Sequence, residues 1–174
     1  MKSFSKSVLI MLVGSLLLLV TLFMPFVSAK NDQKEYLQEY PDEMFSVEYD
    51  MTNEEAINIS LFDFGKLYSQ TGDSTDIIYV LFIAAFAVFA ILTLLFLLLK
   101  KPIATIIFTL LSFGIFRIII WDFTEKGVIA SDYYDLGIAQ YFCYLGAVIV
   151  LVGAIYLWRI KRKLRKESTA ANAT

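Results

Sequence analysis

Few side chains in this sequence are suited to catalysis or to metal binding. The 174 residues include no histidine and a single cysteine, Cys143, which lies in a long apolar run. One chain therefore offers no imidazole base or imidazole metal ligand, no disulfide, no CxxC redox pair and no thiolate zinc site. We expect a protein that is not an enzyme and that has no cofactor and no catalytic or metal-binding residue.

One charged residue, Arg117, lies within the long apolar runs. A charge in lipid costs a few kcal/mol or more, which makes Arg117 a candidate functional residue. It precedes Trp121, the last residue of its run, by four residues, or about 6 Å of helical rise, so its side chain can reach the headgroups and the carboxylate of Asp122 or Glu125. We favour an interfacial anchor or ion pair; the alternative is contact with an anion or a lipid headgroup.

A strongly basic segment follows the last apolar run. Six of the eight residues in 159–166 are lysine or arginine, and each cation near an anionic membrane surface contributes about 1 kcal/mol of attraction. The candidate lipid-headgroup residues are Arg159, Lys161, Arg162 and Lys163. The segment predicts contact with anionic lipids on the cytoplasmic side and a fixed membrane topology, and not nucleic-acid binding.

Four uninterrupted apolar runs must position these residues. Hydrophobic residues make up 58% of the chain, the mean hydropathy is +0.66, and the excess is concentrated in residues 8–27, 77–99, 103–121 and 136–158. Each run is close to the roughly 20 residues that a helix needs to cross a hydrocarbon core. Because backbone amides in lipid must be satisfied within a segment, the sequence predicts an all-α integral membrane protein with a four-transmembrane-helix bundle.

The predicted organisation and orientation follow from these runs. We expect, in order, a cytoplasmic N-terminus (1–7), a first span (8–29), an acidic extracytoplasmic segment (30–75), a second span (76–99), a cytoplasmic turn (100–102), a third span (103–121), an extracytoplasmic loop (122–135), a fourth span (136–158) and a basic cytoplasmic tail (159–174). Basic clusters fall on one side of this layout, whereas residues 30–76 hold twelve acidic residues against three lysines. Since lysine and arginine are retained in the cytoplasm, both termini are expected there, in a multi-pass protein of the plasma (inner) membrane.

The start of the chain also has the pattern of a secretory signal peptide. Lys2 and Lys6 precede the apolar run, and the small residues Ser28 and Ala29 end it, as at a cleavage site. The apolar stretch is longer than an ordinary signal core, so we expect the segment to be retained as the first span. Cleavage after Ala29 is the alternative.

The acidic segment has the pattern of a small folded unit. Apolar and polar residues alternate over 45–52 and over 57–61, a period of two that predicts strands. Because Thr52 to Glu55 separates the two runs, we expect a small outer-loop β-hairpin between helices 1 and 2. Asp63 is expected to cap a short amphipathic helix after it.

Small residues recur along the last span. Ala139, Gly146 and Gly153 lie seven residues apart, which places them on one helix face and lets another helix approach closely. We expect most of these contacts inside the bundle. The same face could serve a homo-oligomer or another membrane protein.

These features favour an accessory, scaffold, immunity or sensor subunit that acts through helix-face and outer-loop contacts. The alternative is a subunit of an oligomeric channel or small-solute transporter, although the spans carry no acidic residue at membrane depth. The layout resembles the general architecture of claudin-type tetraspans. The outer loop here has neither the tryptophan nor the paired cysteines of that family, so the resemblance implies no function and no site residue.

Overall fold

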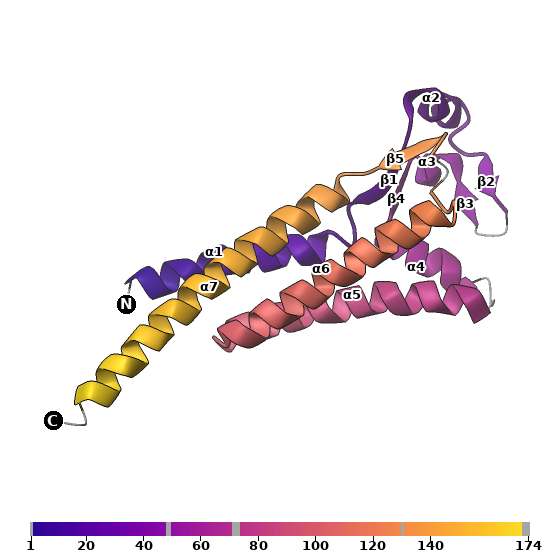
Figure 1. Cartoon of the computed structure of the whole chain (residues 1–174). Coiled ribbons are helices and arrows are strands. Elements are labelled where there is room, and N and C mark those ends of the chain that lie inside the picture. The colour runs from indigo at the N-terminus through magenta and orange to yellow at the C-terminus, as the bar shows by residue number, and fades with distance from the viewer. Residues whose placement is uncertain (1, 48–49, 71–73, 130, 172–174) are drawn as a thin grey trace.

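The computed structural model describes residues 2–47, 50–70, 74–129 and 131–171. Four long helices, α1 (Lys2–Val20), α5 (Ser74–Leu98), α6 (Pro102–Glu125) and α7 (Ala139–Ala171), run alongside one another (Figure 1). The strands and the shorter helices gather at one end, which we call the sheet end. The opposite end, with the α5–α6 turn and the lysines and arginines of α7, is called the basic end.

Three of the described helices are long and apolar enough to cross a membrane. They comprise Asp76–Leu98 in α5, Pro102–Glu125 in α6 and Ala139–Arg165 in α7. These helices overlap the second, third and fourth predicted spans, although Leu136, at the start of the fourth predicted span, lies in a strand. Their composition fits a membrane protein. The apolar part of α1, Ser7–Val20, is shorter.

The first predicted span differs from the structure at its end. α1 ends at Val20, the backbone turns over residues 21–24, and β1 (Pro25–Ala29) follows as a strand. Pro25 lacks an amide donor and disfavours helical backbone at the residue before it, so the helix ends ahead of it. The prediction of a span over residues 8–29 is therefore wrong for its last part, because apolar composition alone does not separate a membrane helix from a buried strand.

β1 is the central strand of a three-stranded antiparallel sheet with the order β4-β1-β5. Val27 pairs with Ile59 of β4 (Asn58–Ser60) on one side and with Leu136 of β5 (Tyr134–Leu136) on the other. The strand after α1 thus joins the segment that precedes α5 to the segment between α6 and α7. Both loops of the sheet end belong to one folded unit.

A separate two-stranded hairpin is formed by β2 (Met44–Ser46) and β3 (Met51–Thr52). The predicted hairpin is present, but it lies within the first alternating run, of which residues 48–49 lie outside the described part of the chain. The second run contains β4, which pairs with β1 instead. The predicted pairing of the two runs is corrected: β4 pairs with β1, whose Phe26 and Val27 are buried, and so it joins a sheet of three strands, which is more stable than an isolated pair.

Short helices fill the rest of the sheet end in the described residues: α2 (Asn31–Glu39), α3 (Asn53–Ala56) and α4 (Leu61–Gln70). Residues 52–55, which were predicted to separate the two strands of the hairpin, form the start of α3. A capping box between Thr52 and Glu55 satisfies backbone amides there. The predicted helix near Asp63 is α4, but it begins at Leu61, so Asp63 lies in its first turn and is not the residue that precedes it as a cap. Ser60 is the residue that precedes the helix. The amide and the hydroxyl of Ser60 donate hydrogen bonds to Asp63 Oδ2, at 2.9 and 2.6 Å.

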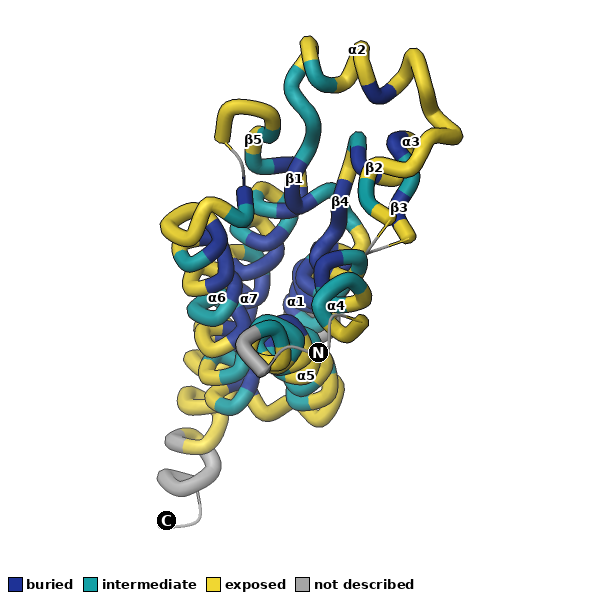
Figure 2. Tube along the Cα trace, turned by 90° about the vertical axis from the view of Figure 1, so that its right-hand side faces the viewer, coloured by how far each residue is buried: buried dark blue, intermediate teal, exposed yellow. Residues whose placement is uncertain are grey.

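Aromatic packing joins the sheet end to the long helices. Phe26 of β1 is 1% exposed. Its ring makes edge contacts with the rings of Phe64 in α4 and of Phe116 and Phe123 in α6, at centroid distances of 6.0, 5.8 and 5.9 Å. Each such pair adds about 0.5–1.5 kcal/mol beyond the burial of the rings. Figure 2 shows the buried residues continuing from β1 and β4 into α6, α7 and α1.

Candidate functional site

A mostly apolar pocket of about 330 Å³ opens at the sheet end. Its volume is at the lower limit of small-molecule sites, which span about 300–1,000 Å³. Its lining comes from β1 to β5, from α4 and from the loop after α6: Val27, Phe45, Ser46, Met51, Ile59, Phe64, Leu67, Tyr68, Val128, Ile129 and Tyr134. None of these described residues is charged, so the pocket suits an apolar group better than acid–base chemistry.

Tyr134 forms a polar edge of this pocket. Its hydroxyl donates a hydrogen bond to the Ala56 carbonyl oxygen at 2.9 Å, which ties β5 to α3. Burial raises the pKa of Tyr134 above its ordinary value of 10.0, because a phenolate is poorly stabilised away from water. The hydroxyl therefore keeps its proton and its donor role at neutral pH.

Exposed apolar side chains recur along residues 36–47, which we call the 36–47 segment. They are Tyr36, Tyr40, Met44, Phe45 and Val47, with exposed fractions from 43% to 83%. Phe45 also lines the pocket. The segment lies in the acidic part of the sequence, and exposed apolar residues rimmed by charged ones mark interaction surfaces.

Arg117 contacts a tyrosine, and no described carboxylate lies in ion-pair range of it. Its Nη1 donates a hydrogen bond to the hydroxyl of Tyr144 in α7, and its guanidinium lies 5.9 Å from the centroid of that ring. Asp122 forms an ion pair with Lys126 instead, with 2.9 Å between Oδ1 and Nζ. The expected pair of Arg117 and Asp122 is corrected, because residues five apart do not share a helix face. Arg117 joins α6 to α7.

The small-residue face of α7 packs against α1. Ala139 is fully buried, and a Cβ on Gly146 would lie 2.8 Å from the Gly14 carbonyl oxygen. A Cβ on Gly153 would lie 2.3 Å from Met11 Cγ. Small residues thus let the two helices approach closely. The face that was considered for a second copy or another protein is occupied by α1 of the same chain.

The four predicted headgroup residues separate into two sets. Lys161 and Arg162 line a groove beside the α5–α6 turn, whereas Arg159 and Lys163 are exposed and do not line it. Lys163 Nζ lies 3.9 Å from Oε1 of Glu167 in a largely exposed pair, which contributes little to stability. The basic tail therefore points its charges in more than one direction.

Sequence reasoning missed the apolar pocket because segments far apart in the chain form it. Neither β5 nor the residues Val128 and Ile129 belong to an alternating run long enough to predict a strand. Pro25 was the available signal: it ends α1 ahead of Phe26 and Val27 and so frees an apolar stretch for strand pairing.

The described part of the chain holds no group of three or more histidine, cysteine or carboxylate side chains placed to bind a metal ion. Its distinguishing features are the apolar pocket, the 36–47 segment and the basic groove. The chain matches no protein-family model, no curated protein and no solved structure.

Proposed function

We propose that this chain is a non-enzymatic four-span protein of the plasma (inner) membrane that acts as an accessory, scaffold, immunity or sensor subunit. The sheet end carries the proposal, because both of its loops fold into one unit with an apolar pocket and the exposed 36–47 segment. An uncharged pocket beside exposed apolar side chains suits recognition of an apolar segment of another protein.

Features of α1 support a fourth span. The apolar part of the helix, Ser7–Val20, corresponds to about 20 Å of rise, and residues 21–24 extend the apolar stretch up to Pro25. It packs against α7 through Gly14 and Gly146, and it exposes Leu9, Ile10 and Val13. Adjacent exposed apolar side chains on a helix suit lipid better than water.

Retention of residues 1–29 also has support in the fold. Cleavage after Ala29 would remove all of β1, the strand that pairs with both β4 and β5. It would also remove Phe26 from the centre of the aromatic cluster. An uncleaved first helix is therefore part of the proposal, and the intact mass of membrane-purified protein checks it.

The distribution of charge supports both termini in the cytoplasm. The basic end holds the lysines of the α5–α6 turn and the basic stretch of α7, whereas the sheet end holds the acidic loops (Figure 1). Because positive charge is retained in the cytoplasm, the sheet end would face outward. A thiol reagent that does not cross membranes should then label Val47→Cys in intact cells, and should label Ser168→Cys in the tail only after the cells are lysed.

Photocrosslinking tests the interaction role. A photoreactive amino acid at Val47 of the full-length protein in its own membranes is expected to give one crosslinked product of defined stoichiometry. Asp132, an exposed position in the other loop of the sheet end, is the matched control and should give no such product. A clean monomer at both positions overturns the proposal.

Ion flux that rises with protein concentration in liposomes containing only this chain would support a channel subunit instead.

A further inference from the structure

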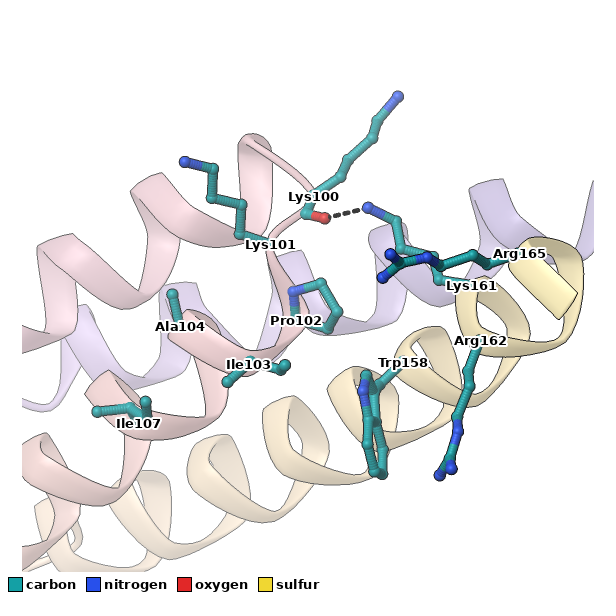
Figure 3. A pocket seen from close by; sticks show the side chains of 10 residues that line it. All are labelled: Lys100, Lys101, Pro102, Ile103, Ala104, Ile107, Trp158, Lys161, Arg162 and Arg165. Atoms are coloured by element: carbon teal, nitrogen blue, oxygen red, sulfur yellow. Dashed lines mark hydrogen bonds between the residues drawn. The ribbon is translucent and has the colours of Figure 1, made fainter. Parts of the chain in front are cut away.

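A groove of about 880 Å³ lies at the basic end, between the α5–α6 turn and α7 (Figure 3). Its lining consists of Lys100, Lys101, Pro102, Ile103, Ala104, Ile107, Trp158, Lys161, Arg162 and Arg165. Half of these described residues are cations and none is a carboxylate. The groove therefore concentrates positive charge that no acidic residue of its own lining offsets.

The groove-facing cations of α7 lie on one face of the helix. Trp158, Lys161, Arg162 and Arg165 follow the spacing i, i+3, i+4 and i+7, which places them side by side. Figure 3 shows Lys161 and Arg165 reaching towards the turn, whereas Arg162 extends beside Trp158. Lys100 and Lys101 of the turn also line the groove, but their side chains extend away from α7 in Figure 3, and Lys101 Nζ lies 6.0 Å from the centroid of the Phe96 ring. The cations that face a ligand in the groove therefore come from α7.

The chain itself positions the two central cations. Lys161 Nζ donates a hydrogen bond to the carbonyl oxygen of Lys100, just after α5. The guanidinium of Arg162 lies 5.9 Å from the centroid of the Trp158 ring. Side chains held in this way lose less freedom when they bind a ligand. The groove is therefore preorganised for an anion.

α6 begins at this groove. Pro102 lies at its start, and no side chain caps the helix, so the amides of Ile103 and Ala104 have no acceptor within it. Both residues line the groove. The partial positive charge of a helix start adds to the field of the lysines and arginines.

The rest of the wall is apolar. Ile103 and Ile107 are 58% and 50% exposed, and they lie one turn apart along α6, leading away from the basic end. A small soluble anion would leave this wall unused. A molecule with an anionic head and a hydrocarbon chain would contact both parts of the groove at once.

We propose that this groove binds an anionic phospholipid, with the phosphate beside the groove-facing cations of α7 and the start of α6 and an acyl chain along Ile103 and Ile107. Basic pockets between membrane helices suit anionic headgroups on the cytoplasmic side. The site uses only α5, α6 and α7, so it does not depend on the partner proposed for the sheet end.

Native mass spectrometry of the full-length protein tests this site, with phosphatidylglycerol and phosphatidylcholine as probes. The variant K161Q/R162Q removes two groove cations, and R159Q/K163Q removes the same charge from the same segment outside the groove. We expect the first variant to bind phosphatidylglycerol roughly tenfold more weakly and the second to stay within roughly twofold of the wild type. Phosphatidylcholine should bind all three proteins weakly. Equal losses in both variants overturn the proposal because they indicate diffuse attraction. No loss in either variant also overturns it, because the groove cations then do not bind the lipid.

Two further arms keep the test decisive. The single variant Arg162→Gln leaves the hydrogen bond of Lys161 to Lys100 intact, and the single variant Arg159→Gln is its control. Unchanged thermal unfolding shows that both variants fold. Glycerol phosphate, which has the phosphate but no acyl chain, should compete poorly with the lipid. Competition by glycerol phosphate or inorganic phosphate at concentrations equal to those of the lipid would overturn the lipid assignment in favour of a soluble anion.

Discussion

The two ends of the molecule are stabilised in different ways. At the sheet end, segments distant in sequence meet around Phe26 in a large buried cluster. At the basic end, the buried cluster is Met11, Leu97, Ala154 and Leu157, and beyond it the α5–α6 turn and α7 border an open groove. Apolar contacts thus determine the structure of one end, whereas the other concentrates charge for contact with its surroundings. Substitutions in the buried cluster of the sheet end should change stability, and substitutions in the groove of the basic end should change lipid binding.

The largest expected effect is at Phe26. Phe26→Ala removes a ring that is 1% exposed and contacts three other rings, so the free energy of unfolding should fall by about 3–5 kcal/mol. Equilibrium unfolding in mixed detergent micelles measures this loss. Phe23→Ala is the control, because Phe23 is 64% exposed and should cost less than about 1 kcal/mol. Equal losses would show that the sheet end is not organised around Phe26.

Gly137→Ala should weaken the attachment of β5 to β1. A Cβ at this position would lie 2.1 Å from the Pro25 carbonyl oxygen, so the strands must move apart, at a cost of about 1–3 kcal/mol. Gly114 has nothing within 4 Å of an added Cβ, and Gly114→Ala should keep or slightly raise stability because alanine favours helix. Thermal unfolding compares the two variants. A harmless Gly137→Ala would contradict the close approach of β1 and β5.

Tyr134→Phe tests a single polar contact of the sheet end. Loss of the hydrogen bond to Ala56 should lower the free energy of unfolding by about 1 kcal/mol at neutral pH. Because the pKa of folded Tyr134 lies above 10.0, its contribution is complete below the unfolded pKa and is lost as pH rises through the folded pKa. Unfolding at pH values from about 8 to about 11 should show the wild type losing its advantage over the variant above pH 10. A constant difference would contradict this assignment.

The smallest expected effect is at the basic end. Lys163 and Glu167 form a pair 3.9 Å apart with side chains 81% and 60% exposed, and exposed pairs contribute little. Lys163→Gln should therefore leave the unfolding transition unchanged, as should Glu167→Gln. A clear loss of stability in either variant would break the contrast, since it would show that charge pairs hold the basic end together.

The long helices are predictable from the sequence because their signals are local. Uninterrupted apolar runs predict α5, α6 and α7, and the two lysines and Pro102 predict the turn between α5 and α6. Trp158, Lys161, Arg162 and Arg165 have the spacing of one helix face, so the sequence also indicates that they share a face that excludes Arg159 and Lys163. The position of the α5–α6 turn beside that face was not readable, because it depends on how the helices pack.

The sheet end is less predictable because its contacts are distant in sequence. β1 lies inside what reads as a membrane run, and its neighbours β4 and β5 come from two different loops. Alternation predicts that a strand exists and does not name its partner. Arg117 illustrates the same point: its partner, Tyr144, lies on another helix, and the rotation of α6 against α7 cannot be read from spacing along α6.

The central position of β1 has a consequence for biogenesis. This strand is synthesised before both of its neighbours, and β5 follows only after α5 and α6. The backbone amides and carbonyls of β1 that face β5, such as those paired with Asp135, have no hydrogen-bond partner in the sheet until most of the chain has been translated. A nascent protein stalled before β5 would present an unpaired strand edge, a surface that invites aggregation or capture by quality-control proteases.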